Sequence, residues 1–273
     1  MKKLYKKLHD GLFGTRCELK PGIKYFRTED FPGLIAERFE FKNSNDTTLR
    51  GNFYYYDKKE NKQLVLFCHG MGGGHAAYIK EINYLAKEGF LVYSFDYQGT
   101  IFSDGTKVGG FLQGLSDVDS CLNALKNASP NQKIYIVGHS WGAFNTMNVI
   151  NDHKEVTKIV EMSGFNSLKQ VFRDSIPNPV KFLAKGMTKI EEEMHPEYKD
   201  ISSLESLKKY DGQALLMHSV DDNMVDYKNT FEIFKKELEG KPNFKFITYQ
   251  NKFHNVTYTD VSVKNLNAYL IQL

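Results

Sequence analysis

The sequence predicts an α/β fold, a mostly parallel sheet that begins with an antiparallel hairpin, carries helices on both faces and has a small inserted cap. Three observations predict it. Short apolar runs of strand length alternate with amphipathic segments of helix length, which is typical of parallel strands buried between helices. Two strand-like segments with a turn-rich link precede these runs. One connection of about 50 residues is far longer than an ordinary loop.

The hairpin is expected at residues 34–41 and 49–56, joined by the turn-rich residues 42–46. Each of the six apolar runs that follow predicts a buried strand: residues 64–68, 90–95, 134–137, 159–162, 214–217 and 244–249. The amphipathic segments between and after the runs predict helices: near residues 78–88, 114–127, 142–152, 226–239 and 259–271. Repeated strand–helix–strand units predict right-handed crossovers.

The long connection, residues 164–212, is interpreted as a cap inserted into a single domain that spans residues 1–273. It contains several prolines and the acidic cluster Glu191–Glu193. We expect this cluster to be a solvated helix face, as charge runs usually are. Residues 1–32 have a basic amphipathic start and a stretch with scattered Gly and Pro, and they predict no defined element.

Composition and charge exclude several classes of protein. The chain has 36 basic and 33 acidic residues, a formal charge of +3, which argues against nucleic acid as a partner. No run of about 18 apolar residues predicts a membrane span, and Met1 to Gly14 lack the apolar stretch of a secretion signal. Cys17, Cys68 and Cys121 match neither a disulfide framework nor a zinc site, so we expect a cytoplasmic protein.

The sharpest motif is Gly138-His139-Ser140-Trp141-Gly142, between a predicted strand and a predicted helix. A nucleophile on such a turn occupies strained backbone, and glycines two residues away on either side let strand and helix pack closely. We therefore expect Ser140 Oγ to be an exposed nucleophile. The helix N-terminus beside it supplies a partial positive charge and free N–H groups where an oxyanion would form.

A second motif, the glycine-rich residues 69–74, directly follows a predicted strand. We expect the backbone N–H groups of Met71 and Trp141 to form an oxyanion hole. The loop does not match a phosphate-binding motif, because neither a Gly-Lys-Ser/Thr ending nor dinucleotide spacing follows. Substrate contacts are expected from residues in and near the two motifs: His69, Gly70, His139 and Phe165.

At these residues the chain resembles the α/β-hydrolase superfamily, whose members have a His-Gly oxyanion loop, an Asp-x-Arg-Gly-x-Gly-x-Ser loop and a nucleophile elbow. The middle loop, Asp96–Ser103, departs from that pattern at Gln98, Thr100 and Ile101. The resemblance covers about residues 34–273, and the chain is similar to the single-domain serine hydrolases that include esterases, monoacylglycerol lipases and peptidase-like members. It implies an α/β-hydrolase fold and a serine triad, and no metal or organic cofactor is needed for that chemistry.

The family order of nucleophile, acid and histidine locates the remaining triad members. His254, after the last predicted strand, matches the family's general base. Residues 218–225 resemble the family's His-Gly-x-x-Asp-x-x-Val turn, with Ser219 in place of Gly. That register selects Asp222 as the acid, while the adjacent Asp221 stays open. Three further histidines follow the nucleophile, and we expect each to be a surface or structural residue: His153, His195 and His218.

These residues predict a serine hydrolase that cleaves a carboxylic ester through an acyl-enzyme. Aromatic residues in loops expected near the site suggest a small or medium, apolar or aromatic acyl group: Tyr97, Phe102, Phe111, Trp141, Phe165 and Phe172. For each of them, plain core packing is the alternative.

The same triad serves an aminopeptidase, a thioesterase or an acyltransferase. An aminopeptidase needs a carboxylate for the substrate ammonium, which Glu191, Glu192 or Glu193 supplies only if the cap folds it inward. An alternative of another class is a non-catalytic binding protein on this scaffold. The expected partner is a small-molecule ester, and the oligomeric state is not predicted.

Overall fold

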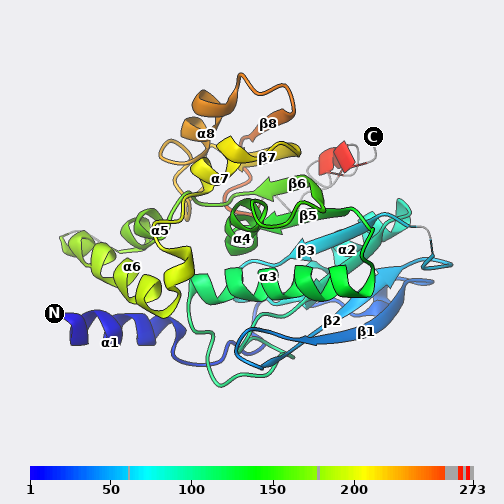
Figure 1. Ribbon diagram of the computed structural model, residues 1–273, viewed down its shortest axis with the longest axis horizontal. Helices are drawn as coiled ribbons and strands as arrows, with labels where there is room; N and C mark the ends of the chain where they lie inside the picture. Colours follow the sequence, from blue (N-terminus) through cyan, green and yellow to red (C-terminus); the bar gives the residue numbers. More distant parts are fainter. Residues whose placement is uncertain (61, 177–178, 256–263, 267–268, 271–273) are drawn as a thin grey trace.

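The computed structural model describes residues 1–60, 62–176, 179–255, 264–266 and 269–270. In these residues eight strands form one sheet in the order β1-β2-β4-β3-β5-β6-β7-β8 (Figure 1). The strands are β1 (Ile35–Lys42), β2 (Thr48–Tyr55), β3 (Leu64–Cys68), β4 (Leu91–Phe95), β5 (Ile134–His139), β6 (Val156–Met162), β7 (Gln213–Ser219) and β8 (Phe244–Tyr249). The predicted hairpin and the six further strands are confirmed, but β8 lies at the edge of the sheet and is only partly buried, so it is not the buried strand that was expected.

Strand β2 pairs antiparallel with β1 and β4, and the remaining neighbours pair parallel. Both faces of the sheet are covered, which β3 illustrates. Leu64, Leu66 and Cys68 belong to one buried cluster, and Val65 and Phe67 belong to a second cluster on the opposite face. This alternation explains why the parallel strands are continuous apolar runs in the sequence.

Helices cover the two faces: α3 (Phe111–Ala128), α4 (Trp141–Val149) and α8 (Phe231–Leu238) contribute to the first cluster, and α2 (Ile79–Lys87) to the second. The predicted helix near 226–239 begins later than expected, because Asp226 accepts a hydrogen bond from the backbone N–H of Asn229 at 2.7 Å in a preceding turn. The helix predicted at 259–271 lies largely outside the described residues. None of the described helices combines the length and apolar composition that crossing a bilayer requires.

The long connection between β6 and β7 holds α5 (Leu168–Ser175), α6 (Leu183–Met194) and α7 (Ser203–Lys209), with 3-10 turns at Val180–Phe182 and Pro196–Tyr198. Two further 3-10 turns lie at Thr28–Asp30 and His75–Tyr78. Helix α6 packs against α5 and against α1 (Lys2–Phe13). The division of the chain into one domain with an inserted cap at 164–212 stays a prediction.

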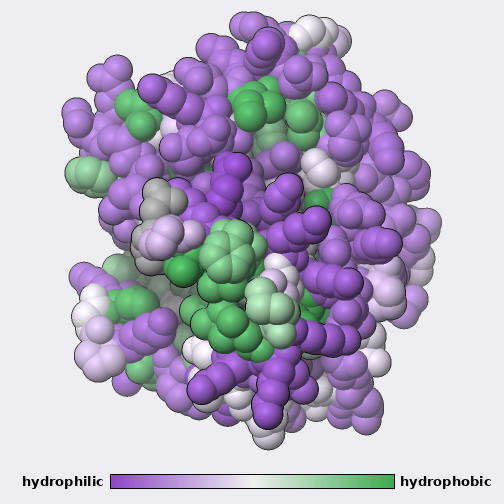
Figure 2. Space-filling model, turned by 90° about the vertical axis from the view of Figure 1, so that its left-hand side faces the viewer, coloured by the Kyte–Doolittle hydropathy of each residue, from purple (hydrophilic) through white to green (hydrophobic). Residues whose placement is uncertain are grey.

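Helix α1 lies in a stretch for which the sequence predicted no element. Its buried side carries His9 and Phe13, and the ring of Tyr5 occupies the space above Gly186 of α6. Its other sides are exposed, and apolar side chains gather on the face of the molecule that carries α1 and α6 (Figure 2). After the helix, Arg16 donates hydrogen bonds to the carbonyl groups of Ile101, Ser103 and Gly105, which fixes this part of the chain to the body of the protein.

The expectation that Glu191–Glu193 form a solvated face is wrong for Glu191. Its carboxylate is completely buried and accepts hydrogen bonds from the backbone N–H groups of Phe111 and Leu112, at 2.9 and 2.8 Å. These are the first residues of α3, so the carboxylate occupies the positive end of that helix. His9 Nε2 lies 3.2 Å from the same carboxylate, so Glu191 joins three helices.

Replacing Glu191 with alanine is therefore expected to lower the free energy of unfolding by about 3–5 kcal/mol, because buried donors lose their acceptor. The neighbouring Glu192 is the control: it is partly exposed and accepts one hydrogen bond, from the backbone N–H of Asp200 at 3.3 Å. Glu192→Ala should change stability by no more than about 0.5 kcal/mol. Urea unfolding followed by circular dichroism measures both, and equal effects would contradict the capping role.

Candidate active site

Ser140 lies on the turn between β5 and α4, with φ 55° and ψ −116°. This positive φ is unusual for a residue with a side chain and is the strained conformation expected of a nucleophile elbow. The flanking glycines are required by close packing: a Cβ at Gly142 would overlap the carbonyl group of Cys68, and one at Gly138 would overlap the carbonyl of Gly142. The turn therefore holds strand and helix close together and carries Ser140 between them.

His254 lies beside this serine. The Ser140 hydroxyl donates a hydrogen bond to His254 Nε2 at 2.8 Å, and His254 Nδ1 donates to Asp222 at 2.9 Å. The three residues come from different loops, each at the carboxyl end of a strand. Their side chains thus form one chain of hydrogen bonds from a carboxylate through an imidazole to a hydroxyl, in the geometry of a nucleophile, a base and an orienting acid.

The side chain of Asp222 is completely buried. It accepts hydrogen bonds from the backbone N–H groups of Met224 and Val225, each at 2.9 Å, as well as from His254. Burial alone raises the pKa of this carboxyl, but hydrogen bonds from His218 and His254 outweigh it, and the pKa lies well below its usual value. Asp221, left open by the sequence, instead accepts from Ser219 Oγ, and the geometry places Asp222 beside the imidazole.

His218 is a second histidine on the same carboxylate. Its Nε2 lies 3.1 Å from Asp222 and donates to the carbonyl group of Val225 at 3.1 Å. Burial lowers the pKa of His218. Asp222 and the buried Glu161 raise this pKa by more than burial lowers it, so it lies above the usual value. The sequence predicts only a surface or structural role for this histidine, and the one sign of its contact is the four-residue spacing from His218 to Asp222.

Replacing His218 with glutamine is expected to lower kcat about tenfold and leave KM within about twofold, because Asp222 loses one of the groups that orient it. His153 offers a matched control, since it is also buried and paired with carboxylates, Asp119 and Glu155, at 2.9 Å each. His153→Gln should leave kcat unchanged. Steady-state kinetics on a soluble ester measures both variants, and an equal loss in the two would show a general effect on folding.

A chain of hydrogen bonds joins the glycine-rich loop to His254. The backbone N–H of Gly70 donates to Tyr78 Oη at 3.1 Å, Tyr78 pairs with His139 Nδ1 at 2.8 Å, and His139 Nε2 donates to the carbonyl group of His254 at 2.9 Å. Burial, with a smaller effect of His254, lowers the pKa of His139 to about 3, so this imidazole is neutral. The network fixes the loop around Met71 relative to the base.

A cavity of about 580 Å³ opens at Ser140 and His254. Gly70, Met71 and His139, predicted to contact the oxyanion or the substrate, line it. Apolar residues outside the motifs also line it: Ile23, Phe26, Ala77 and Met224. No residue of 164–212 is among the described residues that line this cavity, and residues 22–26 form one wall instead. No sequence pattern indicates that wall, because these residues carry no motif and belong to the start of the chain, for which no element is predicted.

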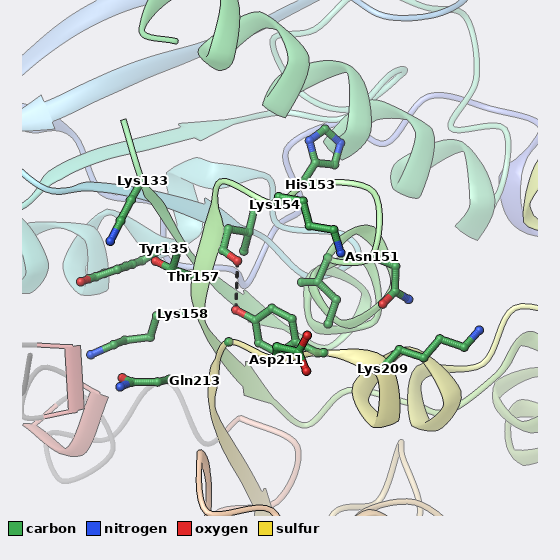
Figure 3. Close-up of a pocket in the computed structure, with 14 residues that line it drawn as sticks. Lys133, Tyr135, Asn151, His153, Lys154, Thr157, Lys158, Lys209, Asp211 and Gln213 are labelled. Carbon is green, nitrogen blue, oxygen red and sulfur yellow. Dashed lines mark hydrogen bonds between the residues drawn. The ribbon is translucent and has the colours of Figure 1, made fainter. Parts of the chain in front are cut away.

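A second cavity, of about 500 Å³, lies at the other edge of the sheet (Figure 3). It is lined by Lys133, Tyr135, Val156 and Gln213, from the amino ends of β5, β6 and β7 and their approaches. Ser140, Asp222 and His254 all follow the carboxyl ends of strands, where ligands of open α/β sheets bind. The cavity at Ser140 is therefore the candidate active site.

The structure does not support two of the predicted substrate contacts. His69 is completely buried and packs on Tyr97, with 4.2 Å between ring centroids. Phe165 is buried between Phe111 and Phe144. Both follow strands near the site, but their side chains point into the core, and neither lines the cavity.

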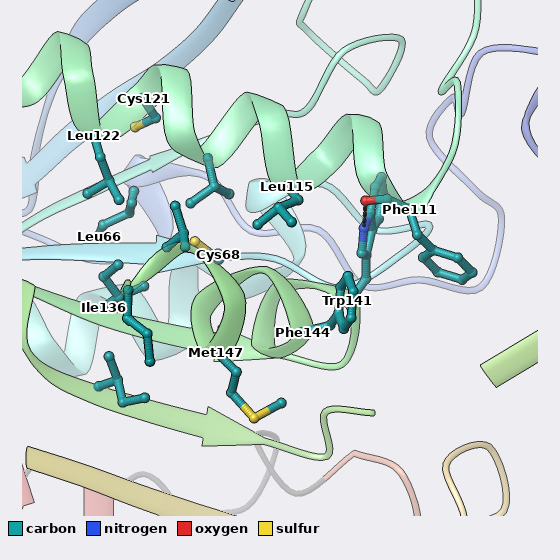
Figure 4. Packing of buried hydrophobic residues seen from close by; sticks show 14 of the residues in the cluster. Leu66, Cys68, Phe111, Leu115, Cys121, Leu122, Ile136, Trp141, Phe144 and Met147 are labelled. Carbon is teal, nitrogen blue, oxygen red and sulfur yellow. Dashed lines mark hydrogen bonds between the residues drawn. The ribbon is translucent and has the colours of Figure 1, made fainter. Parts of the chain in front are cut away.

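Most of the aromatic residues singled out in the sequence are likewise core residues, among them Tyr97, Phe172 and Trp141. The Trp141 indole donates to the carbonyl group of Phe111 at 3.0 Å and packs under α3 (Figure 4). The backbone N–H of Trp141 lies at the first position of α4, where the helix itself supplies no acceptor.

In the described residues, no group of three or more His, Cys, Asp or Glu side chains is arranged to hold a metal ion.

The chain is similar in sequence to known hydrolases. The chain is 25% identical over 237 residues to the monoacylglycerol lipase of Saccharomyces cerevisiae. The alignment covers 77% of this chain and 49% of the lipase, so the chain spans about half the length of that relative. It is 27% identical over 210 residues to 2-hydroxy-6-oxononadienedioate/2-hydroxy-6-oxononatrienedioate hydrolase 1 of Pseudomonas putida, covering 74% of this chain and 70% of that protein.

Among solved structures, the esterase Pf2001 of Pyrococcus furiosus superposes with a TM-score of 0.72 at 18% identity, covering 93% of this chain and 98% of the esterase. This likeness concerns the fold. Residues 59–210, more than half of the chain, match the family described as serine aminopeptidase, S33. The protein is therefore an enzyme of the α/β-hydrolase superfamily and belongs to its serine aminopeptidase, S33 family.

Proposed function

We propose that Ser140, His254 and Asp222 act as a catalytic triad and that the protein hydrolyses a carboxylic ester with a small or medium apolar acyl group. The observation that carries the proposal is the 2.8 Å hydrogen bond from Ser140 Oγ to His254 Nε2 at an open cavity. A hydroxyl is a weak nucleophile, and an adjacent oriented base is what activates it.

In the first half of the reaction His254 Nε2 removes the Ser140 proton while Oγ bonds to the ester carbonyl carbon. The C–O bond to the alcohol then breaks, and His254 gives the same proton to the leaving alkoxide. In the second half His254 takes a proton from water, the hydroxide attacks the acyl-enzyme, and the proton returns to Ser140 as the acid leaves. Asp222 holds the imidazole tautomer and stabilises its cation.

The backbone N–H groups of Met71 and Trp141 are the proposed donors to the tetrahedral oxyanion. Trp141 begins α4, so the helix dipole adds to its N–H. Met71 lies in the loop that the Tyr78–His139 network holds in place. Loss of one such donor typically raises the barrier by about 2.7–4 kcal/mol.

An ester is favoured over a peptide with a free amino terminus by the lining of the cavity. The described lining contains no carboxylate that could hold a substrate ammonium, and it includes Lys24 and Lys80. Glu191 binds the start of α3, Glu192 binds the backbone of Asp200, and Glu193 pairs with Lys2 at 2.8 Å. The apolar acyl preference now depends on Ile23, Phe26 and Met224 in place of the predicted aromatic residues.

Labelling with a fluorophosphonate tests the proposal, because this reagent reports an activated serine without assuming a substrate. We expect one covalent adduct by intact mass, located on Ser140 by peptide mapping. Hydrolysis of p-nitrophenyl esters with acyl groups of increasing length then measures the longest acyl group that the cavity accepts. We expect kcat/KM to fall once the acyl group is longer than the cavity. Absence of an adduct on folded protein would overturn the proposal and favour a non-catalytic binding protein.

We expect a small-molecule partner and a cytoplasmic location for this protein. The proposed chemistry requires a small-molecule acyl substrate and no cofactor, and no nucleic acid is expected at a chain with a formal charge of +3. The three cysteines are free thiols, two of them buried. A cytoplasmic location stays our prediction.

A further inference from the structure

Helix α1 exposes an apolar stripe. Met1, Leu4, Leu8 and Leu12 are 72, 45, 36 and 59% exposed. The three leucines are four residues apart, so they lie along one side of the helix. The neighbouring side carries Tyr5, His9 and Phe13, also four residues apart, and packs on the protein. The helix thus has two apolar sides, and the folded protein covers one of them.

The remaining side of α1 is strongly basic. Lys2, Lys3, Lys6 and Lys7 against Asp10 give the helix a formal charge of +3, which is the formal charge of the whole chain, so the rest of the sequence is balanced. All four lysines are exposed, and Lys2 pairs with Glu193. The excess positive charge therefore lies on the element that exposes the leucines.

The helix that carries the stripe is attached to the body of the protein. Phe13 contacts the ring of Phe111 with 5.0 Å between centroids, and Arg16 binds three backbone carbonyl groups immediately after the helix. Val180 and Phe182, just before α6, are also exposed. Apolar side chains are gathered on this face in Figure 2 and are bordered by hydrophilic ones.

Contacts through the core join α1 to the residue beside the candidate nucleophile. The carbonyl group of Phe111, which α1 contacts through Phe13, accepts from the indole of Trp141, the residue after Ser140.

We propose that α1 binds an anionic lipid surface, with Leu4, Leu8 and Leu12 entering the interface and Lys3, Lys6 and Lys7 contacting the head groups. A basic amphipathic helix with exposed leucines has the two features that hold a peripheral protein on such a surface, since apolar burial and charge attraction together exceed either alone. Self-association through this face is disfavoured, because two copies would bring two basic helices together.

Co-sedimentation with lipid vesicles tests the proposal. The full chain should bind vesicles of equal parts phosphatidylcholine and phosphatidylglycerol and bind phosphatidylcholine vesicles at least about tenfold more weakly. Leu4→Ser/Leu8→Ser/Leu12→Ser should weaken binding to the mixed vesicles at least about tenfold. Lys3→Gln/Lys6→Gln/Lys7→Gln should weaken it about 100-fold and remove its dependence on salt.

A matched control comes from α8, where Ile233 is 40% exposed and Lys235 and Lys236 are exposed. Ile233→Ser/Lys235→Gln/Lys236→Gln should bind like the wild type. Circular dichroism verifies that each variant folds, and vesicle binding is independent of turnover, so Ser140→Ala should also bind like the wild type even if no ester is hydrolysed. Equal binding to neutral and anionic vesicles would overturn the proposal, as would a dimer in light scattering that the leucine variant dissociates.

Discussion

Alanine in place of Ser140 is expected to lower kcat for p-nitrophenyl butyrate about a million-fold. The rate that remains is the uncatalysed rate with the acceleration that substrate binding supplies. The hydroxyl is the atom that would bond to the substrate, so no neighbouring group replaces it. Its side-chain contact is the hydrogen bond to His254, and the fold should remain intact. Steady-state kinetics with intact mass analysis of the variant measures the loss.

Ser163 provides a close control for this substitution. It also follows the carboxyl end of a strand and has a positive φ of 53°, against 55° for Ser140. Its hydroxyl is buried, with no hydrogen-bond partner in the described part of the chain. Ser163→Ala should keep kcat within about twofold and remain labelled by a fluorophosphonate. A substantial activity left in Ser140→Ala, or an equal loss in Ser163→Ala, would contradict the assignment of the nucleophile.

Asparagine in place of Asp222 is expected to lower kcat about 10,000-fold, because an amide no longer holds the imidazole in the tautomer that accepts the serine proton. Asp221→Asn should stay within about threefold, since that carboxylate binds Ser219 and the backbone of Lys252. The two substitutions are chemically identical and one residue apart. A dead Asp221 variant beside an active Asp222 variant would reverse the assignment.

Asp222→Asn should also differ from the wild type in acid stability. The pKa of Asp222 is lowered in the folded protein, so its ionised form stabilises the fold above its usual value of 3.8, and that contribution is lost as the pH falls further. Asp222→Asn removes this contribution and places an amide among donors. We expect its unfolding free energy at neutral pH to fall by about 1–3 kcal/mol, with the difference from wild type shrinking at low pH.

The parts of this protein that the sequence predicts well are those set by local pattern. The strand β3 is a continuous apolar run because both its faces are buried, and Gly142 follows Ser140 because the elbow has no room for a side chain beside Cys68. Residue order within the superfamily then selected His254 and Asp222. These choices depended on spacing along the chain, which the sequence contains in full.

The missed features depend on contacts between distant residues. Glu191 was expected at the surface because its carboxylate sits in a charge run, but its partners Phe111 and His9 lie 80 and 182 residues away. The nearness of His69 and Phe165 to the motifs predicts contact with the substrate, but their side chains point into the core. The wall at residues 22–26 was missed because apolar residues in an irregular segment do not indicate what they face.

The contact between His9 and Glu191 also has a consequence for biosynthesis. At a ribosomal rate of about 5–20 residues per second, α1 emerges about 10–35 s before the helix that it packs against, because 182 residues separate the two side chains. Until then both apolar sides of α1 are open to solvent beside its lysines. We therefore expect nascent chains that end before Glu191 to be the species most prone to aggregation and most in need of a chaperone.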